Sequence, residues 1–283
     1  MEQTTKPKKW IQRLGYLALN VQDLDRSVDF YERCINLTLT QREADRAFLR
    51  TQFEHHCLVL YQSDTSGLRH TAYETLSDEA TVGLKELLEQ QGVPLREAPE
   101  LPGRIGLAFQ FQDPDGRWVE IYRTQERMPG RVSQGPFKML KLGHFNMQSE
   151  NPEPTIEFFR SIGMRLSDKI AIGSWLRCNE DHHGLAILKG KPIFHHHAYD
   201  VGDWEQIKLV LDWMYKQGVP VEAGPLRHGP GNNINLYVKD PDGVRIEFYC
   251  ELEQIYDDED HVREFTSKFN IWLQQAAPEH FYE

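Results

Sequence analysis

The sequence predicts an α+β fold made of two tandem copies of one unit, each combining short, mostly antiparallel strands with two helices. One observation is length, since 283 residues exceed a typical single domain and suit two. Another is an internal repeat with an offset of roughly 127 residues. A third is the turn sequence DPDG, which occurs once in each half. Together they predict duplicated modules rather than one continuous core.

The repeat extends through nearly the whole chain. FLRTQFEHHCLVLY, which starts at Phe48, matches WLRCNEDHHGLAIL, which starts at Trp175. QDPDGRWVEIY ends at Tyr122 and matches KDPDGVRIEFY, which ends at Tyr249. The openings LGYLALNVQDLDRSVDFY and LGHFNMQSENPEPTIEFF also correspond. Each half is therefore one copy of the unit.

Each copy begins with a strand that leads into a helix. Alternation in LGYLALNV predicts the strand, and the apolar spacing in SVDFYERCI predicts the helix. Three short β-rich runs follow, and then a second helix, VGLKELLEQQGV or DWEQIKLVLDWMYKQGV, whose closing Gly suits a helix C-terminus. Two more strands complete the copy. DPDG joins them, because Pro fixes φ and Gly allows a positive φ in a tight turn.

These elements predict four segments. We expect a first domain over residues 1–125, a linker over 126–139, a second domain over 140–257 and a tail over 258–283. The linker contains ERMPGRVSQGPF, which is rich in Gly, Pro and polar residues. The tail is charged and then weakly helical around FTSKFNIWLQQ. It is either a solvated helix or a lid over a pocket.

Composition excludes several classes of partner. The chain has 32 Lys+Arg against 43 Asp+Glu, a net charge of −11, which disfavours binding to nucleic acid. No apolar run approaches the ~20 residues that span a membrane, and the start MEQTTKPKKW lacks the apolar stretch of a signal peptide. We therefore expect a cytoplasmic protein without a membrane partner. The four cysteines form no CxxC pair and are expected to be reduced, buried thiols: Cys34, Cys57, Cys178 and Cys250.

The second copy offers a set of metal ligands. His144, His196 and Glu247 lie on three separate strand-like segments, so their side chains can point toward one ion. Two histidines and one carboxylate leave coordination positions open for exogenous partners, as a redox metal site requires. Spacing alone is weak evidence, because a lone histidine on a strand is usually part of the core or the surface.

Comparison of the two copies sharpens this prediction. The first copy has Tyr16, His70 and Glu120 where the second has its two histidines and its glutamate. Tyr is a poor replacement for neutral imidazole on a divalent ion, so we expect metal in the second copy only. His183 has a counterpart in His56, so its presence alone does not identify a catalytic residue.

At these residues the chain resembles type I extradiol catechol dioxygenases of the vicinal oxygen chelate superfamily. It is closest in motif to the homoprotocatechuate 2,3-dioxygenase and catechol 2,3-dioxygenase branches. The strings that carry the resemblance are LGHFNM, HHGLAI, FHHHAYDV, RHG and NLYVKDPDGVRIEFY. The resemblance implies tandem βαβββ modules, a glyoxalase-like fold, with an N-terminal domain that is not catalytic.

The resemblance also implies roles for individual residues. The ligands of Fe(II), or alternatively of Mn(II), would be His144, His196 and Glu247. The catalytic groups would be His183, His228 and Tyr237. The groups on the substrate side would be Asn146 and Arg227. In the homoprotocatechuate branch an Arg before the catalytic His meets the substrate carboxylate. The aligned position here is Ala223, which leaves open whether the substrate is carboxylated.

The implied activity is extradiol cleavage of a catechol-type ring by O₂, which gives a product of the hydroxymuconic semialdehyde type. His183 would serve as a general acid, work that suits a side chain whose ordinary pKa is near neutrality. The resemblance implies a homo-oligomer, a tetramer or a dimer. The alternatives are a metal-free binding protein and a glyoxalase-like isomerase of the same superfamily. The ligand count disfavours the isomerase, because such sites resemble four-ligand arrangements.

Overall fold

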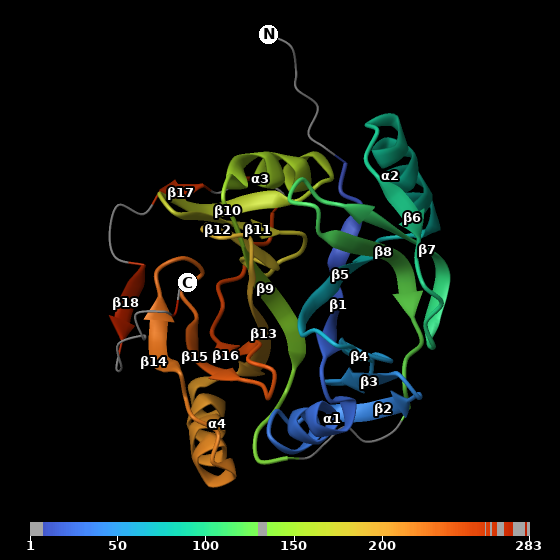
Figure 1. The fold of residues 1–283 in the computed structure, drawn as a ribbon. Helices are drawn as coiled ribbons and strands as arrows, with labels where there is room; N and C mark the ends of the chain where they lie inside the picture. Colours follow the sequence, from blue (N-terminus) through green and yellow to red (C-terminus); the bar gives the residue numbers. More distant parts are fainter. Residues whose placement is uncertain are drawn as a thin grey trace.

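The computed structural model describes residues 8–129, 135–257, 259–260, 262–264, 269–273 and 281. Two curled mixed sheets, one from each half of the chain, lie beside each other (Figure 1). The described strands of the first sheet fall within residues 11–125, and those of the second within 141–273. The duplication predicted from the sequence thus corresponds to two separate sheets.

The first sheet has the strand order β2-β3-β4-β1-β5-β8-β7-β6. Its strands are β1 (Ile11–Val21), β2 (Thr38–Arg42), β3 (Arg46–Arg50), β4 (Leu58–Gln62), β5 (Gly67–Thr75), β6 (Leu95–Glu97), β7 (Arg104–Gln112) and β8 (Trp118–Gln125). Helices α1 (Leu24–Arg33) and α2 (Asp78–Gln90) follow β1 and β5.

The second sheet repeats this order and adds a strand at each end, β17-β10-β11-β12-β9-β13-β16-β15-β14-β18. Its strands are β9 (Lys141–Ser149), β10 (Arg165–Ile170), β11 (Gly173–Arg177), β12 (Leu185–Lys189), β13 (Phe194–Gly202), β14 (Ala223–His228), β15 (Ile234–Lys239), β16 (Arg245–Cys250), β17 (Arg263–Glu264) and β18 (Asn270–Leu273). Helices α3 (Pro152–Ser161) and α4 (Trp204–Gln217) follow β9 and β13.

Each sheet therefore contains the strand-helix-three-strand unit twice, as in β9-α3-β10-β11-β12 and β13-α4-β14-β15-β16. The predicted fold class is confirmed, but the strand count within a copy differs. Four strands, not three, separate the helices, and three, not two, follow the second helix. The three-residue β6 is too short to show a period of two, and β14 contains Gly224 and Pro225, which are typical of turns.

Local sequence sets where the helices begin and end. The Asp23 side chain accepts a hydrogen bond from the backbone N–H of Arg26 at the start of α1. At the start of α4, the Asp203 side chain accepts one from the backbone N–H of Gln206. Gly218 ends α4 with φ of 71°, in the left-handed region that favours glycine. The predicted glycine at the helix C-terminus is thus confirmed there.

The two DPDG turns tie the halves of the molecule together. Asp115, in the first turn, accepts hydrogen bonds from Ser149 at 2.7 Å and Thr155 at 2.9 Å, both in the second half. Asp240, in the second turn, accepts one from Tyr31 of α1 at 3.0 Å. Each copy thus inserts its turn into the opening strand-helix region of the other copy, so the interface has approximate twofold character.

The tail differs from its prediction where it is described. Residues 270–273 of FTSKFNIWLQQ form strand β18, antiparallel to β14, because β14 would otherwise leave its outer backbone groups unpaired. Residues 265–268 and 274–275 of that string lie outside the described residues. Within the described residues, none of the helices has the length and apolar character needed to cross a membrane.

Candidate metal centre

Three adjacent strands bring the predicted ligands together. β13 lies between β9 and β16, and its Ala198 pairs with both His144 and Glu247. Nε2 of His144 is 3.4 Å, and Nε2 of His196 is 3.0 Å, from Oε2 of Glu247. The three potential ligand atoms lie within 4.8 Å of one another. All three side chains are buried, so they can converge on one ion inside the second sheet.

The residues present fit a divalent cation. Nε2 of His196 is buried 3.0 Å from the Glu247 carboxylate, yet among the described residues it has no partner with hydrogen-bond geometry. Burial lowers the pKa of His196 to about 4, which favours the neutral imidazole that binds metals. Burial also tends to raise the pKa of Glu247, but the facing histidines outweigh it and hold that pKa well below its usual range. A neutral His196 imidazole therefore faces an ionised carboxylate.

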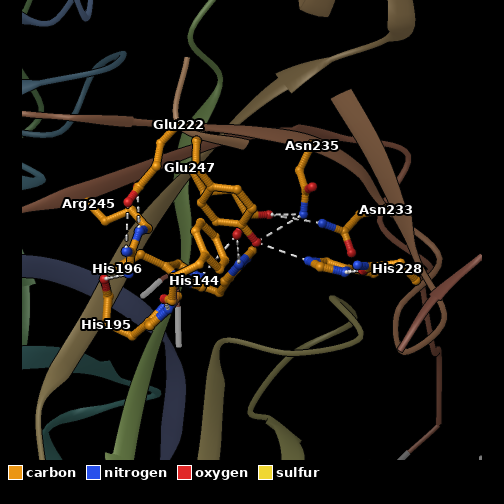
Figure 2. A network of polar contacts seen from close by, with 12 residues as sticks. His144, His195, His196, Glu222, His228, Asn233, Asn235, Arg245 and Glu247 are labelled. Carbon is orange, nitrogen blue, oxygen red and sulfur yellow. Dashed lines mark hydrogen bonds and ion pairs between the residues drawn. The ribbon is translucent and has the colours of Figure 1, made fainter. Parts of the chain in front are cut away.

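Two asparagines that the sequence analysis did not single out fix the other carboxylate oxygen. Asn233 and Asn235 donate to Oε1 of Glu247 at 3.0 Å and 2.8 Å, which leaves Oε2 toward the histidines. Figure 2 shows the asparagines and the ligand histidines on opposite sides of this network. The first copy has Gly106 and Ala108 at the equivalent positions, so the same comparison of copies contains a signal for them.

His228 and Tyr237 form a hydrogen-bonded pair beside the ligands. Nδ1 of His228 lies 2.7 Å from Oδ1 of Asn270, and its Nε2 lies 3.0 Å from the Tyr237 hydroxyl. Because a carbonyl oxygen accepts, Nδ1 of His228 carries its proton and Nε2 can accept from Tyr237. Burial lowers the pKa of His228, which favours this neutral form. The oxygen of Tyr237 accepts from Asn235 at 3.3 Å.

His183 lies against the ligand His144, with ring centroids 4.3 Å apart. Its Nδ1 is 3.0 Å from Nδ1 of His182, whose Nε2 is 2.9 Å from the buried carboxylate of Asp168. Arg263 donates to the same carboxylate at 2.8 Å. Burial lowers the pKa of His183 well below its ordinary value. Its resting state is therefore the neutral imidazole, although the ordinary pKa of a histidine lies near neutrality.

These groups surround a small cavity. It is lined by the ligands, the three expected catalytic residues and a further set, Asn146, Trp175, Ala186, Leu188, His195, Phe269 and Phe281. Its volume of about 20 Å³ is close to the room that one water needs, so a ring-sized ligand requires side chains to shift. Oδ1 of Asn146 is buried and has no hydrogen-bond partner among the described residues.

The structure does not place Arg227 with the other predicted site residues. It is absent from the cavity lining among the described residues. Its guanidinium donates to Glu251 at 2.6 Å and to the Asn232 carbonyl at 2.7 Å. Its contacts therefore lie outside the set of residues that line the cavity.

The equivalent place in the first copy is filled by a closed polar cluster. Tyr16 and Arg104 donate to Oε1 of Glu120 at 2.6 Å and 2.9 Å, and Gln110 donates to its Oε2 at 2.8 Å. Nε2 of His70 lies 3.2 Å from the Tyr16 hydroxyl. The Arg104 guanidinium thus supplies the positive charge that a bound cation would supply. In the described residues, a group of three metal-binding side chains occurs in the second copy alone.

Two repeated βαβββ sheets, with a two-histidine, one-carboxylate centre in only one of them, define a metal-binding protein of the paired-module class. The chain matches the Glyoxalase/Bleomycin resistance protein/Dioxygenase superfamily over residues 13–121 and 141–248, and it belongs to that superfamily.

Known proteins resemble the chain over most of its length. A manganese-dependent 2,3-dihydroxybiphenyl 1,2-dioxygenase from Geobacillus genomosp. 3 is 28% identical over 87% of this chain and 87% of its own. An iron-dependent extradiol dioxygenase from Rhodococcus jostii (strain RHA1) is 25% identical over 93% of this chain and 96% of its own. The Mn(II)-bound glyoxalase from Novosphingobium aromaticivorans superimposes with a TM-score of 0.90 at 24% identity, covering 97% and 94% of the two chains.

Proposed function

We propose that the chain is an extradiol dioxygenase, which opens a catechol-type ring with O₂ at a mononuclear Fe(II) centre or, alternatively, a Mn(II) centre. The product is of the hydroxymuconic semialdehyde type. The observation that carries this proposal is the convergence of His144, His196 and Glu247 on one point beside His183 and the Tyr237–His228 pair. Relatives named as a manganese-dependent 2,3-dihydroxybiphenyl 1,2-dioxygenase and an iron-dependent extradiol dioxygenase support it.

In this proposal, Nε2 of His144, Nε2 of His196 and Oε2 of Glu247 hold the ion. Bound there, a divalent ion lowers the pKa of catechol hydroxyls and brings the ring and O₂ to one centre. Asn233 and Asn235 hold the Glu247 carboxylate with Oε2 toward the ion, because their amides donate hydrogen bonds to Oε1. The protein's own contribution is therefore a carboxylate with one oxygen reserved for the ion.

The Tyr237–His228 pair orients the ring and receives a proton. The Tyr237 hydroxyl donates to Nε2 of His228, so its oxygen can accept a hydrogen bond from a hydroxyl of the substrate. A proton leaving that hydroxyl can pass through Tyr237 to Nε2 of His228, because Asn270 holds the proton of His228 on Nδ1. Each proton transfer thus runs along a hydrogen bond, from the substrate to Tyr237 and from Tyr237 to His228, as general base catalysis requires.

His183 manages a second proton on the other side of the ligands. Nε2 of His182 lies 2.9 Å from the carboxylate of Asp168, which favours a proton on that nitrogen and leaves Nδ1 of His182 to accept from Nδ1 of His183. Nε2 of neutral His183 is then a base toward the cavity. It takes a proton from the substrate before it can return one as a general acid. Asn146 offers its unpartnered Oδ1 to a donor on the substrate.

Two alternatives in the same superfamily predict different outcomes. A binding protein would hold a catechol without consuming O₂, and a glyoxalase-like isomerase would rearrange its substrate without O₂. The decisive experiment loads metal-free protein with Fe(II) under anaerobic conditions and then adds O₂ with a panel of catechols, some with a carboxylate. We expect stoichiometric oxygen uptake and a yellow product. Catechol binding without oxygen uptake would contradict the proposal.

The proposal extends to organisation and location. We propose the division into domains over 1–125 and 140–257, a linker over 126–139 and a tail over 258–283. The change of sheet between β8 and β9 supports the linker, and β17 and β18 of the tail join the second sheet. A homo-oligomer, tetramer or dimer, is supported by exposed apolar side chains such as those of Trp204 and Ile271. Light scattering on the purified protein tests it. A cytoplasmic location is supported by the four cysteines, which are buried and unpaired.

A further inference from the structure

Two neighbouring histidines on β13 contact each other although strand geometry would separate them. Successive side chains on a strand point to opposite faces. The pairing of β13 with β9 shifts register between Phe194 and His196, however, so His195 is the additional residue of a bulge. As a result, Nδ1 of His195 lies 2.7 Å from Nδ1 of His196, and both rings are buried.

A residue far along the chain reaches the outer side of His195. The backbone carbonyl oxygen of Phe281 is 2.8 Å from Nε2 of His195, across 86 positions of sequence. The Phe281 ring is 2% exposed and packs against Tyr237 at 4.9 Å between ring centroids. It also lies under the guanidinium of Arg245, 4.3 Å from its centroid. Phe281 is therefore anchored in the site by contacts separate from this hydrogen bond.

The hydrogen bonds determine where each proton sits. A carbonyl oxygen can only accept, so Nε2 of His195 carries a hydrogen. A neutral imidazole has one N–H, so Nδ1 of His195 accepts, and Nδ1 of His196 must be the donor between the two rings. Nε2 of His196 is left with its lone pair, 3.0 Å from Oε2 of Glu247. In the opposite tautomer this nitrogen would carry a hydrogen and could not bind a metal.

We infer that the Phe281 carbonyl and His195 are positioning groups that hold the ligand His196 in its metal-binding tautomer. This inference rests on the proposed metal centre. It goes beyond that centre because it makes the tail a determinant of metal affinity, through a peptide group rather than a side chain. Partners that fix the tautomer of a ligand histidine commonly change metal affinity by about 10- to 100-fold.

The first copy gives an internal comparison. Arg69 occupies the place of His195 next to His70, the counterpart of His196. Arg69 is exposed, donates to Asn20 at 3.2 Å and lies 4.4 Å from the ring centroid of Tyr61. Among the described residues, an imidazole hydrogen-bonded to the histidine at this ligand position therefore occurs in the copy that has a complete ligand set and not in the other.

The experiment measures Mn(II) affinity of metal-free protein from the electron paramagnetic resonance signal of unbound Mn(II). One truncation stops after His280 and removes Phe281, while its matched control stops after Phe281 and keeps the carbonyl oxygen. Phe281→Ala keeps the peptide group but removes the ring. His195→Leu removes the acceptor for His196, whereas His195→Asn retains an acceptor close to Nδ1. Circular dichroism confirms that each variant is folded.

We expect the truncation after His280 to weaken Mn(II) binding by about 10-fold or more, and the truncation after Phe281 to leave it unchanged. His195→Leu should cause a similar loss, His195→Asn a smaller one and Phe281→Ala little. In the His195→Leu background, truncation after His280 should add no further loss, because the connection is already broken.

Equal affinity for the two truncations would overturn the inference, as would losses that simply add in the double variant. If His195→Leu does not fold, the pair of truncations still decides. Failure of the full chain to bind one Mn(II) would instead refute the metal centre itself and, with it, this inference.

Discussion

At the scale of single residues, the two oxygens of one carboxylate have different tasks. Oε1 of Glu247 accepts from Asn233 and Asn235, and Oε2 faces the ligand histidines. Neutral amides orient the carboxylate without cancelling its charge. In the first copy, Glu120 accepts from the Gln110 amide and also from the Arg104 guanidinium, whose positive charge offsets the charge of the carboxylate. The kind of donor, more than the presence of a carboxylate, separates a site that can bind a cation from one that cannot.

We predict that Asn235→Leu weakens metal binding by about 10-fold, because Oε1 of Glu247 loses a buried partner and the carboxylate can turn away. The measurement is Mn(II) affinity of the metal-free protein. Asn146→Leu serves as control, since it changes an amide of the same cavity that is not hydrogen-bonded to Glu247 in the described residues. Equal losses in both variants would mean that cavity polarity, not carboxylate orientation, matters.

For His183, we expect that His183→Phe keeps metal and catechol binding but slows turnover by about 10²-fold or more, the usual range for a lost general acid or base. Stopped-flow kinetics with catechol and O₂, together with metal analysis, provide the test. Wild-type turnover would return His183 to a structural role like that of its counterpart His56.

At the scale of elements, the helices and the opening strand of each copy were predictable because each depends on local patterns, whereas the number of strands between and after the helices was not. Alternation marked β1 and β9, and a glycine marked the end of α4. The bulge in β13 was not predictable, since the three consecutive histidines of FHHHAYDV give no sign of which one is the additional residue. The pairing of β13 with β9 determines the position of the bulge. The strand at residues 270–273 likewise depends on the open edge of β14, which is distant in sequence.

A buried strand histidine should make stability depend on pH. Burial lowers the pKa of His70, on β5, to about 3, below its ordinary value of 6.5. Between these pH values the unfolded chain binds a proton that the folded chain does not, so stability is lost as pH falls from about 6.5 toward 3. We predict that the free energy of unfolding of His70→Gln falls less steeply over this range than that of wild type. Parallel curves would contradict it.

At the scale of the whole molecule, duplication made most of the centre visible. Every ligand could be compared with a position in the other copy. Because Tyr16 stands in the first copy where the second has His144, the comparison indicated the second copy as the metal-binding one. A comparison of the two copies cannot identify residues that have no counterpart in the other copy. Asn270 and Phe281 lie beyond the repeat, and they meet the site only because the chain returns to it after β16. Arg227 is adjacent to His228 in sequence, but its guanidinium contacts Asn232 and Glu251, which do not line the cavity in the described residues.

We predict about one bound ion per chain and that the first copy is dispensable for binding it. His70→Ala combined with Glu120→Gln should lower thermal stability but leave iron per folded chain unchanged. His196→Ala combined with Glu247→Gln should abolish iron binding and catechol turnover. Metal analysis and oxygen uptake on both double variants test this. If the first pair of substitutions alone abolished iron binding, the metal site would lie in the first half of the chain and the prediction would be wrong.

The Arg104–Glu120 ion pair also constrains what the first copy can become. A substitution of Tyr16 by histidine would restore the missing imidazole, but the guanidinium 2.9 Å from the carboxylate would still repel an incoming cation. Removal of Arg104 alone would leave a buried, poorly compensated carboxylate and no second imidazole. Neither single step brings an advantage by itself. The ion pair therefore means that a metal site in the first copy would require changes at both Tyr16 and Arg104.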